Sequence, residues 1–256
     1  MDEVSGSRLS RRWRVMQASG GRLVVMPDAL RFVVAGVTTR RYANAQIDDY
    51  TGLPRERFPW RPPLRMTVVA RIGTPIAGTA GFGFWNAPIS PLGKVLPVLP
   101  AAVWFFYASP PSDMPLARGV PGSGWKVATI DATTRQAWAW APAAPLVVLM
   151  NRLPLLYRMV WPRVQRALAI CEAAIAPPDT MFREYTLEWY NGGARFFVEG
   201  QLVHEAMCAP QGPLGFVAWV DNQWLIATPD GRFGWGVHTV TGAQWMDVAR
   251  VCITPS

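Results

Sequence analysis

Apolar and polar residues alternate along several short stretches, as they do in β-strands with one buried face. Between Leu64 and Ile72, every second residue is apolar, and arginine or threonine separates most of them. Residues 185–189 alternate in the same way, and Asn191-Gly192-Gly193 follows. Asn and Gly accept the positive φ of a tight turn, so this motif predicts a hairpin. A second turn at Gly200-Gln201 extends the pattern into an antiparallel meander over residues 182–207.

Further segments of five to ten residues have strand-like composition and end at Gly, Pro or Asp. The fully apolar segment 101–108 is typical of a central strand with both faces covered. The predicted strands outside the meander are 13–18, 22–26, 29–34, 40–47, 64–72, 79–86, 101–108, 125–131, 135–140, 214–221, 223–227 and 244–253. This series predicts an all-β fold.

The pattern changes between residues 143 and 176, which are rich in Leu, Met, Arg and Ala. This composition predicts helix, broken near Pro154 and Pro162, with Pro162 in the first turn of a second helix. The β pattern resumes after Pro177-Pro178. We therefore predict one β-sandwich domain over residues 1–256, with a helical insertion at about 143–176 and a flexible segment at 1–10.

Composition narrows the function only slightly. The chain has 256 residues and 13 Trp, more than core packing comfortably explains, so some rings are expected to line a groove or an interface. The alternative is that most of them pack between two sheets. The net charge is +8, but the arginines are dispersed, which argues against a specific nucleic-acid surface.

The cysteines and the N-terminus bear on the compartment. Cys171, Cys208 and Cys252 have no metal-binding or redox spacing, so free thiols in a reducing compartment are expected. Residues 1–13 show no apolar secretory core, and no run of about 20 apolar residues could span a bilayer. These features predict a cytoplasmic protein with no cofactor and no metal.

Residues 185–203, YTLEWYNGGARFFVEGQLV, resemble a hairpin of the concanavalin A-like lectin/glucanase superfamily, and most closely that of family 16 glycoside hydrolases. Residues 244–251 resemble the closing strand of that family, where an Asp and an Arg recur. Residues 79–86 are similar to the strand that precedes its active site. The resemblance covers roughly residues 60–140 and 180–254. It implies a jelly-roll sandwich of two antiparallel sheets with a concave face that holds ligand.

The catalytic residues of that family do not carry over. Its hydrolases have a Glu-x-Asp-x-x-Glu run on one strand, and retaining hydrolysis needs two carboxyl groups about 5 Å apart. The equivalent strand should be 101–108, which contains no carboxylate, and the nearest acid is Asp113. The resemblance therefore implies a member without that chemistry, and the catalytic residues are unknown.

The candidate ligand-binding residues are Trp85, Asn86, Trp104, Trp219 and Asp221. The three tryptophans could project from neighbouring strands onto the concave face. Tyr107 is three residues after Trp104 on the same predicted strand, so the two side chains point to opposite faces. Without a bulge, they cannot line the same cleft. Core packing of these rings, and a plain turn at residues 221–223, are the alternatives.

Other polar residues are weaker candidates. Asp48-Asp49 could bind calcium, but further oxygen ligands are missing and a solvated loop is expected instead. His204 and His238 are the only imidazoles, and structural roles are expected for both.

We therefore predict a protein that binds carbohydrate or a flat apolar molecule in its concave face. The alternatives are an enzyme acting on a small apolar substrate in a pocket covered by the helical insertion, or a diverged glycoside hydrolase. The helices themselves could be a lid, a dimer or partner surface, a membrane-surface element, or a pair simply packed on the sandwich.

Overall fold

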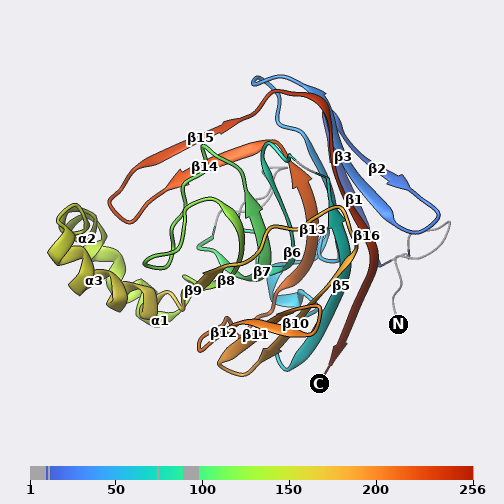
Figure 1. Cartoon of the computed structure of the whole chain (residues 1–256). Helices are drawn as coiled ribbons and strands as arrows, with labels where there is room; N and C mark the ends of the chain where they lie inside the picture. Colours follow the sequence, from blue (N-terminus) through green and yellow to red (C-terminus); the bar gives the residue numbers. More distant parts are fainter. Residues whose placement is uncertain (1–9, 11, 74, 89–97, 256) are drawn as a thin grey trace.

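The computed structural model describes residues 10, 12–73, 75–88 and 98–255. Within these residues, two antiparallel seven-stranded sheets face each other (Figure 1). The predicted all-β class and two-sheet sandwich are confirmed. The segment 1–10, which we expected to be flexible, lies outside the described residues except for residue 10.

The first sheet has the strand order β1-β4-β13-β6-β7-β8-β9. All of its pairings are antiparallel. Its strands are β1 (Arg14–Ala18), β4 (Asn44–Asp48), β13 (Gly215–Asp221), β6 (Thr79–Trp85), β7 (Ala101–Ala108), β8 (Gly124–Asp131) and β9 (Cys171–Ala174). The apolar segment 101–108 lies inside this sheet, as its composition predicts.

The second sheet has the strand order β12-β11-β10-β5-β16-β3-β2. Its strands are β12 (Gln201–Ala206), β11 (Gly193–Val198), β10 (Arg183–Tyr190), β5 (Leu64–Ile72), β16 (Val240–Pro255), β3 (Leu30–Val37) and β2 (Gly21–Val25). A separate hairpin pairs β14 (Gln223–Ala227) with β15 (Phe233–Val237). A short 3-10 helix, η1 (Arg55–Arg57), follows β4.

The predicted meander forms β10, β11 and β12 at one edge of the second sheet. Tyr190 pairs with Gly193 across the first turn, where Gly192 has φ +89°. Of the alternating residues in β10, Tyr185, Leu187 and Trp189 are buried in the main core. The period of two therefore assigned these residues to the correct face.

The main core fills the space between the sheets and includes several contacts between aromatic rings. Phe82 packs edge-on against Tyr185, with ring centroids 5.2 Å apart, and Phe84 packs against Trp189 at 5.5 Å. Phe105 meets Phe196 from the second sheet at 5.4 Å. Because each strand buries every second residue here, the intervening residues of the first sheet must point to its opposite face.

The insertion between β8 and β9 is helical but starts earlier than predicted. It contains α1 (Arg135–Trp140), the 3-10 helix η2 (Ala141–Ala143), α2 (Ala144–Asn151) and α3 (Pro154–Ala167). Figure 1 places these helices on the side of the first sheet that faces away from the second sheet. None of the helices in the described part of the chain is long and apolar enough to cross a membrane.

Three local predictions in this region are wrong. The segment 135–140 is not a strand, because Thr134 caps a helix there: its Oγ1 accepts a hydrogen bond from the Ala137 amide. Residues 171–174 are a strand rather than helix, since they pair with β8. Pro162 lies inside α3, and the proline in the first turn is Pro154.

Candidate functional site

The outer face of the first sheet, turned away from the second sheet, collects the tryptophans singled out in the sequence. Register places Trp219 of β13 opposite Gly81, and Gly83 opposite Trp104 of β7. Residues opposite each other on paired strands share a face. Trp85 and Phe106 therefore lie on this face too, and the structure brings together all three predicted tryptophans.

Four rings form a continuous cluster, which we call the aromatic platform: Trp85, Trp104, Phe106 and Trp219. The Trp85 and Trp219 rings are nearly parallel, at 8°, with centroids 6.5 Å apart. Trp104 stacks on Phe106 at 5.6 Å and 17°, and it lies 5.5 Å from Trp219. Trp219 is only 8% exposed, but the other three rings are partly accessible. Two pairs of near-parallel rings thus offer partly exposed flat surfaces.

Glycines in β6 make room for this platform. A Cβ atom on Gly81 would come within 3.0 Å of the Trp219 ring, and one on Gly83 would lie 2.6 Å from the Trp104 Cα. Gly83 also has φ +149°, which side chains other than glycine rarely adopt. Glycine at these two positions of β6 therefore lets the neighbouring tryptophan residues approach the strand closely.

Hydrogen bonds fix two of the rings. Trp219 Nε1 donates to Thr79 Oγ1 at 2.9 Å, and Trp85 Nε1 donates to the Tyr50 hydroxyl at 2.8 Å. Tyr50 in turn packs against Phe58 at 4.8 Å and closes one end of the platform. Both indoles are thereby positioned before any ligand arrives, which lowers the entropic cost of binding.

Asn86 and Asp221 lie next to the platform but are engaged with the protein. Asn86 is buried, its Nδ2 donates to the Leu99 carbonyl, and its Oδ1 accepts from the Ala101 amide. Asp221 is also buried, and its Oδ1 accepts from the Thr79 amide and hydroxyl. Their polar groups are thus used within the fold and are not presented to a ligand as we expected.

Burial has a second effect on Asp221: it raises the pKa of this carboxyl to about 7, because the charged form loses its hydration. The neighbouring Asn222 makes the turn into β14. Its side chain accepts from the Ala43 amide and donates to the His238 carbonyl. The alternative of a plain structural turn at residues 221–223 therefore describes this segment well.

The acidic pair Asp48 and Asp49 is not a solvated loop, contrary to our expectation. Both carboxylates are buried. Asp48 accepts from the Thr51 amide and hydroxyl, while Asp49 accepts from Trp60 Nε1 at 2.7 Å and from the Phe216 amide. These donors replace the water that the two carboxylates lose on burial. The resulting hydrogen bonds hold the chain after β4 against the sheet. Among the described residues, no group of three or more His, Cys, Asp or Glu is arranged for a metal ion.

The remaining aromatic and imidazole candidates lie away from the platform. Tyr107 packs on the main core beside Trp125, as its parity predicts. The His204 ring stacks on Phe196, and His238 Nε2 lies 3.2 Å from the Ser109 hydroxyl. Burial lowers the pKa of both imidazoles. These contacts agree with the structural roles expected for the two histidines.

The loop 109–123, which follows β7, covers the β8 and β9 side of the outer face. It is held by Lys126 of β8, a residue that is almost fully buried. The Lys126 ammonium lies 2.6 Å from Glu172 of β9 and also donates to the Met114 and Pro121 carbonyls. Glu172 accepts a hydrogen bond from the Ala117 amide. This buried ion pair therefore fastens the loop to the sheet and limits the platform to one half of the face.

Comparison with known proteins identifies the architecture. No protein-family model matches the sequence, nor does any curated protein. Solved structures do match over nearly the whole chain. Apo Crh5 transglycosylase has a TM-score of 0.52 and 14% identity, covering 100% of this chain and 83% of that chain. The Emp47p carbohydrate recognition domain has a TM-score of 0.51 and 7% identity, covering 99% of this chain and 93% of that chain.

A third match is the Bacillus licheniformis β-glucanase, with a TM-score of 0.50 and 9% identity, covering 98% of this chain and 95% of that chain. The chain has the concanavalin A-like lectin/glucanase fold. The suspected superfamily is therefore confirmed at the level of fold. At such low identity the likeness concerns the concanavalin A-like architecture alone.

On this fold, β7 takes the place that the sequence resemblance gave to the catalytic strand. Its outer-face residues are Ala102, Trp104, Phe106 and Ala108, so β7 carries no carboxylate on this face. The carboxylates on the neighbouring strands of this face are Asp48, Glu172 and Asp221. All three are buried and accept hydrogen bonds or an ion pair from the protein. Each of these three carboxylates is thus engaged with other groups of the fold.

A separate cavity of about 260 Å³ lies between the helices, the loop 109–123 and the β14–β15 turn. Its wall is mostly apolar and includes Leu116, Trp161 and Phe233. Trp161 Nε1 donates to the Leu116 carbonyl, which joins α3 to the loop. Sequence analysis predicted a pocket under the helices as an alternative but could not name these residues, because they come from three distant segments.

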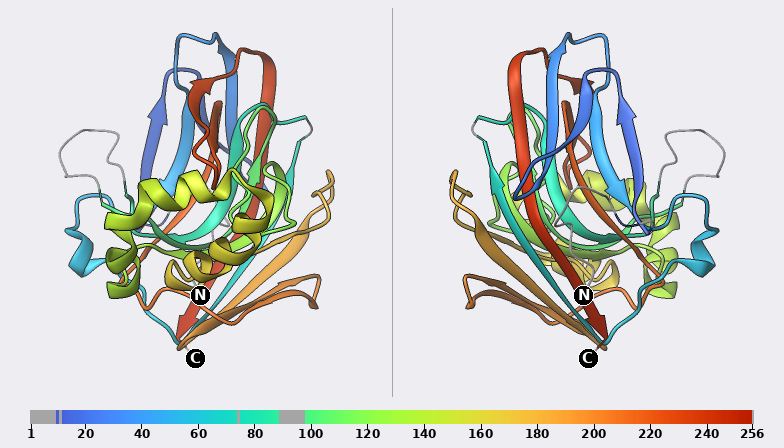
Figure 2. Two further views of the ribbon diagram at one scale, coloured as in Figure 1. Left: turned by 90° about the vertical axis from the view of Figure 1, so that its left-hand side faces the viewer. Right: turned by 90° about the vertical axis from the view of Figure 1, so that its right-hand side faces the viewer.

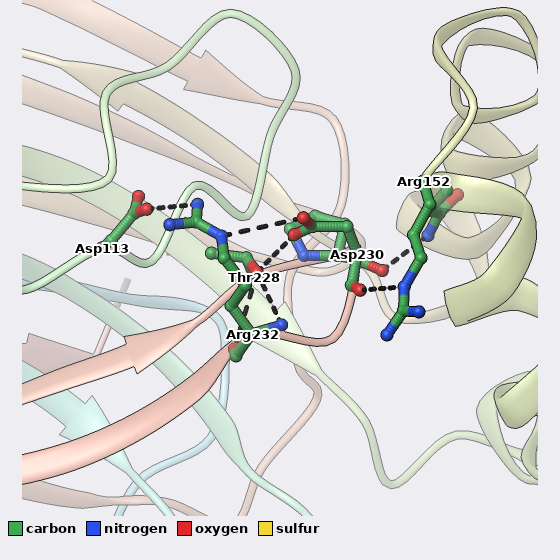
Figure 3. Close-up of polar contacts among 7 residues, drawn as sticks. Asp113, Arg152, Thr228, Asp230 and Arg232 are labelled. Carbon is green, nitrogen blue, oxygen red and sulfur yellow. Dashed lines mark hydrogen bonds and ion pairs between the residues drawn. The ribbon is translucent and has the colours of Figure 1, made fainter.

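Polar contacts hold the β14–β15 turn at the mouth of this cavity (Figure 3). The Arg232 guanidinium lies 2.6 Å from the Asp113 carboxylate, and Thr228 donates to Asp230. From the helices, Arg152 donates to the Asp230 carbonyl at 3.4 Å. Asn151 of α2 also donates to the Pro229 carbonyl. The turn, the loop and the helices therefore form one contiguous structure.

Proposed function

We propose that this protein binds carbohydrate on the aromatic platform and does so without glycosidase chemistry. The observation that carries the proposal is the pair of near-parallel ring sets, Trp85 with Trp219 and Trp104 with Phe106, on the outer face of a concanavalin A-like sandwich. Flat aromatic surfaces suit the apolar faces of sugar rings. The indole N–H groups of Trp85 and Trp219 donate within the fold, so these residues would offer a ligand their ring faces.

The comparisons support carbohydrate at a coarse level. The similar structures include a transglycosylase, a carbohydrate recognition domain and a β-glucanase. The lack of available acids on β7 and its neighbours favours the binding function over hydrolysis. In this proposal the ligand contacts Trp104, Trp85 and the edge of Trp219, while Asp221 holds Thr79, the residue that accepts the Trp219 indole N–H.

The test is a glycan array beside a β-glucan hydrolysis assay. We expect binding without turnover, and loss of binding in Trp104→Ala. Trp138→Ala is the matched control, because Trp138 is exposed on α1 and lies outside the platform. Hydrolysis of any glucan by the wild-type chain would overturn the proposal and favour a diverged hydrolase.

A second candidate is a small apolar ligand in the 260 Å³ cavity. Its apolar lining favours such a molecule over a sugar, and its volume approaches the lower end of typical ligand pockets, roughly 300 Å³. Trp161 lines this cavity, so quenching of its fluorescence by an apolar probe would report occupancy. Loss of quenching in Phe233→Ser, with glycan binding retained, would separate this candidate from the first.

We also propose that the helical insertion has a role apart from the platform and contacts a membrane or a partner. The support for this role is their exposed apolar side chains.

A further inference from the structure

The helical insertion exposes an unusual number of large apolar side chains. Leu146 and Leu149 of α2, Leu153 in the bend, and Leu155 and Met159 of α3 are all more than half exposed, and Leu155 reaches 70%. Trp138 of α1 is 62% exposed. Figure 2 shows these helices at the outer surface, with no other element in front of them. Scattered exposed leucines need no explanation, but this many on one short segment mark an interaction surface.

The arrangement on α3 separates an inner from an outer side. At about 100° per residue, Leu155 and Met159 lie within about 40° of each other. Arg158 and Arg163 fall on either side of this apolar stripe. The opposite side carries Trp161 and Val164, which are buried in the small core that α2 and α3 share. An outward stripe of Leu and Met with flanking arginines is the pattern of a helix that lies in a membrane interface.

The charge of the segment is one-sided. Residues 132–171 contain five arginines and not a single Asp, Glu or Lys. The arginines are Arg135, Arg152, Arg158, Arg163 and Arg166, and each is exposed. Arg163 and Arg166 contact only carbonyl oxygens of α3 itself, so their charge is not neutralised by an acid there. Among the described residues, acids near the segment include Asp131 and Glu172, which flank it, and Asp230, whose carbonyl accepts from Arg152. The Glu172 carboxylate pairs with Lys126, and the Asp230 carboxylate lies near Arg232.

We propose that helices α1–α3 dock on the surface of an anionic lipid bilayer. Leu149, Leu155 and Met159 would insert among the acyl chains near the headgroups, and the flanking arginines would bind lipid phosphates. Each arginine near such a surface adds to the attraction for anionic headgroups. Trp138 suits the interface, where its ring is half in water. The helices lie on the membrane and do not span it, since none has the required length.

A second copy of the chain fits this surface less well. A two-fold interface sets the same patch against itself. Here it would bring ten arginines together, five from each copy, with no acid in the segment to balance them. Charge complementarity therefore favours an anionic partner, and the apolar stripe favours a lipid one. The inference does not depend on carbohydrate binding by the platform.

The test is co-sedimentation of the full chain with vesicles of phosphatidylcholine alone, or of phosphatidylcholine and phosphatidylglycerol in equal parts. We expect binding to the anionic vesicles that weakens as salt is added. Leu149→Gln/Leu155→Gln/Met159→Gln should reduce binding at least tenfold. Arg158→Gln/Arg163→Gln should reduce it about tenfold or more. Leu202→Gln/Met207→Gln is the matched control, because both residues are exposed outside the helices.

All of these positions are exposed, so the variants are expected to fold, and an unchanged melting temperature and circular dichroism spectrum would verify this. No binding to anionic vesicles, or equal loss in the Leu202→Gln/Met207→Gln control, would overturn the proposal. A dimer in analytical ultracentrifugation that the apolar variant dissolves, without any vesicle binding, would also overturn it and assign the surface to self-association.

Discussion

The sulfur atoms of Cys171 and Cys208 lie 2.6 Å apart and join the edges of the two sheets. Cys171 begins β9, an edge strand of the first sheet, and Cys208 follows β12, an edge strand of the second. A hydrogen bond from the Cys208 thiol lowers the pKa of Cys171 to about 6. A thiolate is the nucleophile in disulfide exchange, so Cys171 is the more reactive of the two.

We predict that oxidised glutathione converts this pair to a disulfide. The Cys171 thiolate attacks the glutathione disulfide and releases one reduced glutathione. Cys208, after losing its proton, then displaces the second. The cross-link closes a loop of 37 residues. It should stabilise the fold by about 2–4 kcal/mol. Intact mass and the melting temperature before and after oxidation would check this.

Cys171→Ser should abolish both changes, while Cys252→Ser should leave them intact and serves as the control. If oxidation instead produces only a mixed disulfide with glutathione, the two sulfurs are not within reach of each other. The sequence pattern suggested free thiols in a reducing compartment. The geometry makes the oxidised pair accessible wherever an oxidant is present.

The aromatic platform predicts that substitutions at Trp104 weaken ligand binding in proportion to the ring surface that they remove. For whichever glycan the array identifies, Trp104→Ala should weaken binding by about 10- to 200-fold, as expected for removal of a central aromatic contact of about 1.5–3 kcal/mol. Trp104→Phe should retain much of the affinity, because a ring remains. Isothermal titration would measure both, and equal losses in the two variants would argue against stacking.

The ion pair between Lys126 and Glu172 predicts a strong asymmetry between single and double variants. Lys126→Met leaves the Glu172 carboxylate buried and unpaired, which should cost about 3–5 kcal/mol of unfolding free energy. Lys126→Met/Glu172→Leu removes both charges and should recover much of that loss. Urea denaturation of the wild type, both single variants and the double variant gives the coupling energy. Additive effects would show that the pair is not coupled.

Asp221 predicts a specific dependence of stability on pH. Its pKa is about 7 in the fold, against about 3.9 in an unfolded chain. Between these values the folded state binds the extra proton, so the stability contributed by this group falls as pH rises from 4 towards 7. The loss is at most about 4 kcal/mol, at 1.36 kcal/mol per pKa unit.

Asp221→Asn should therefore gain stability relative to the wild type when pH rises from 5 to 8. The half-buried His204 and His238 act in the opposite direction, because their pKa is lowered. They are the same in both proteins, so their effect cancels in the difference. Urea titrations at both pH values would measure it. A difference that stays constant between pH 5 and 8 would contradict the raised pKa.

Local patterns predicted most of the fold. Alternation at Tyr185, Leu187 and Trp189, followed by the Asn-Gly turn, placed the meander and its buried face correctly, because strand parity is a property of neighbouring residues. The same parity placed Trp104 on the face opposite Tyr107. The prediction for 135–140 was wrong, because a single cap at Thr134 changed a strand-like pattern into a helix.

The sequence by itself determined most of the strands, the main hairpin, the lack of acids on β7 and the one-sided charge of the helical segment, but it missed β9 and β15. Only the tertiary structure decided which residues meet. Trp85 and Trp219 are far apart in the chain and become parallel neighbours through the pairing of β6 with β13. Burial of Asp48 and Asp49, and the approach of Cys171 to Cys208, depend on the same long-range packing. Parity fixes the face of a side chain, but strand order and register fix its partners.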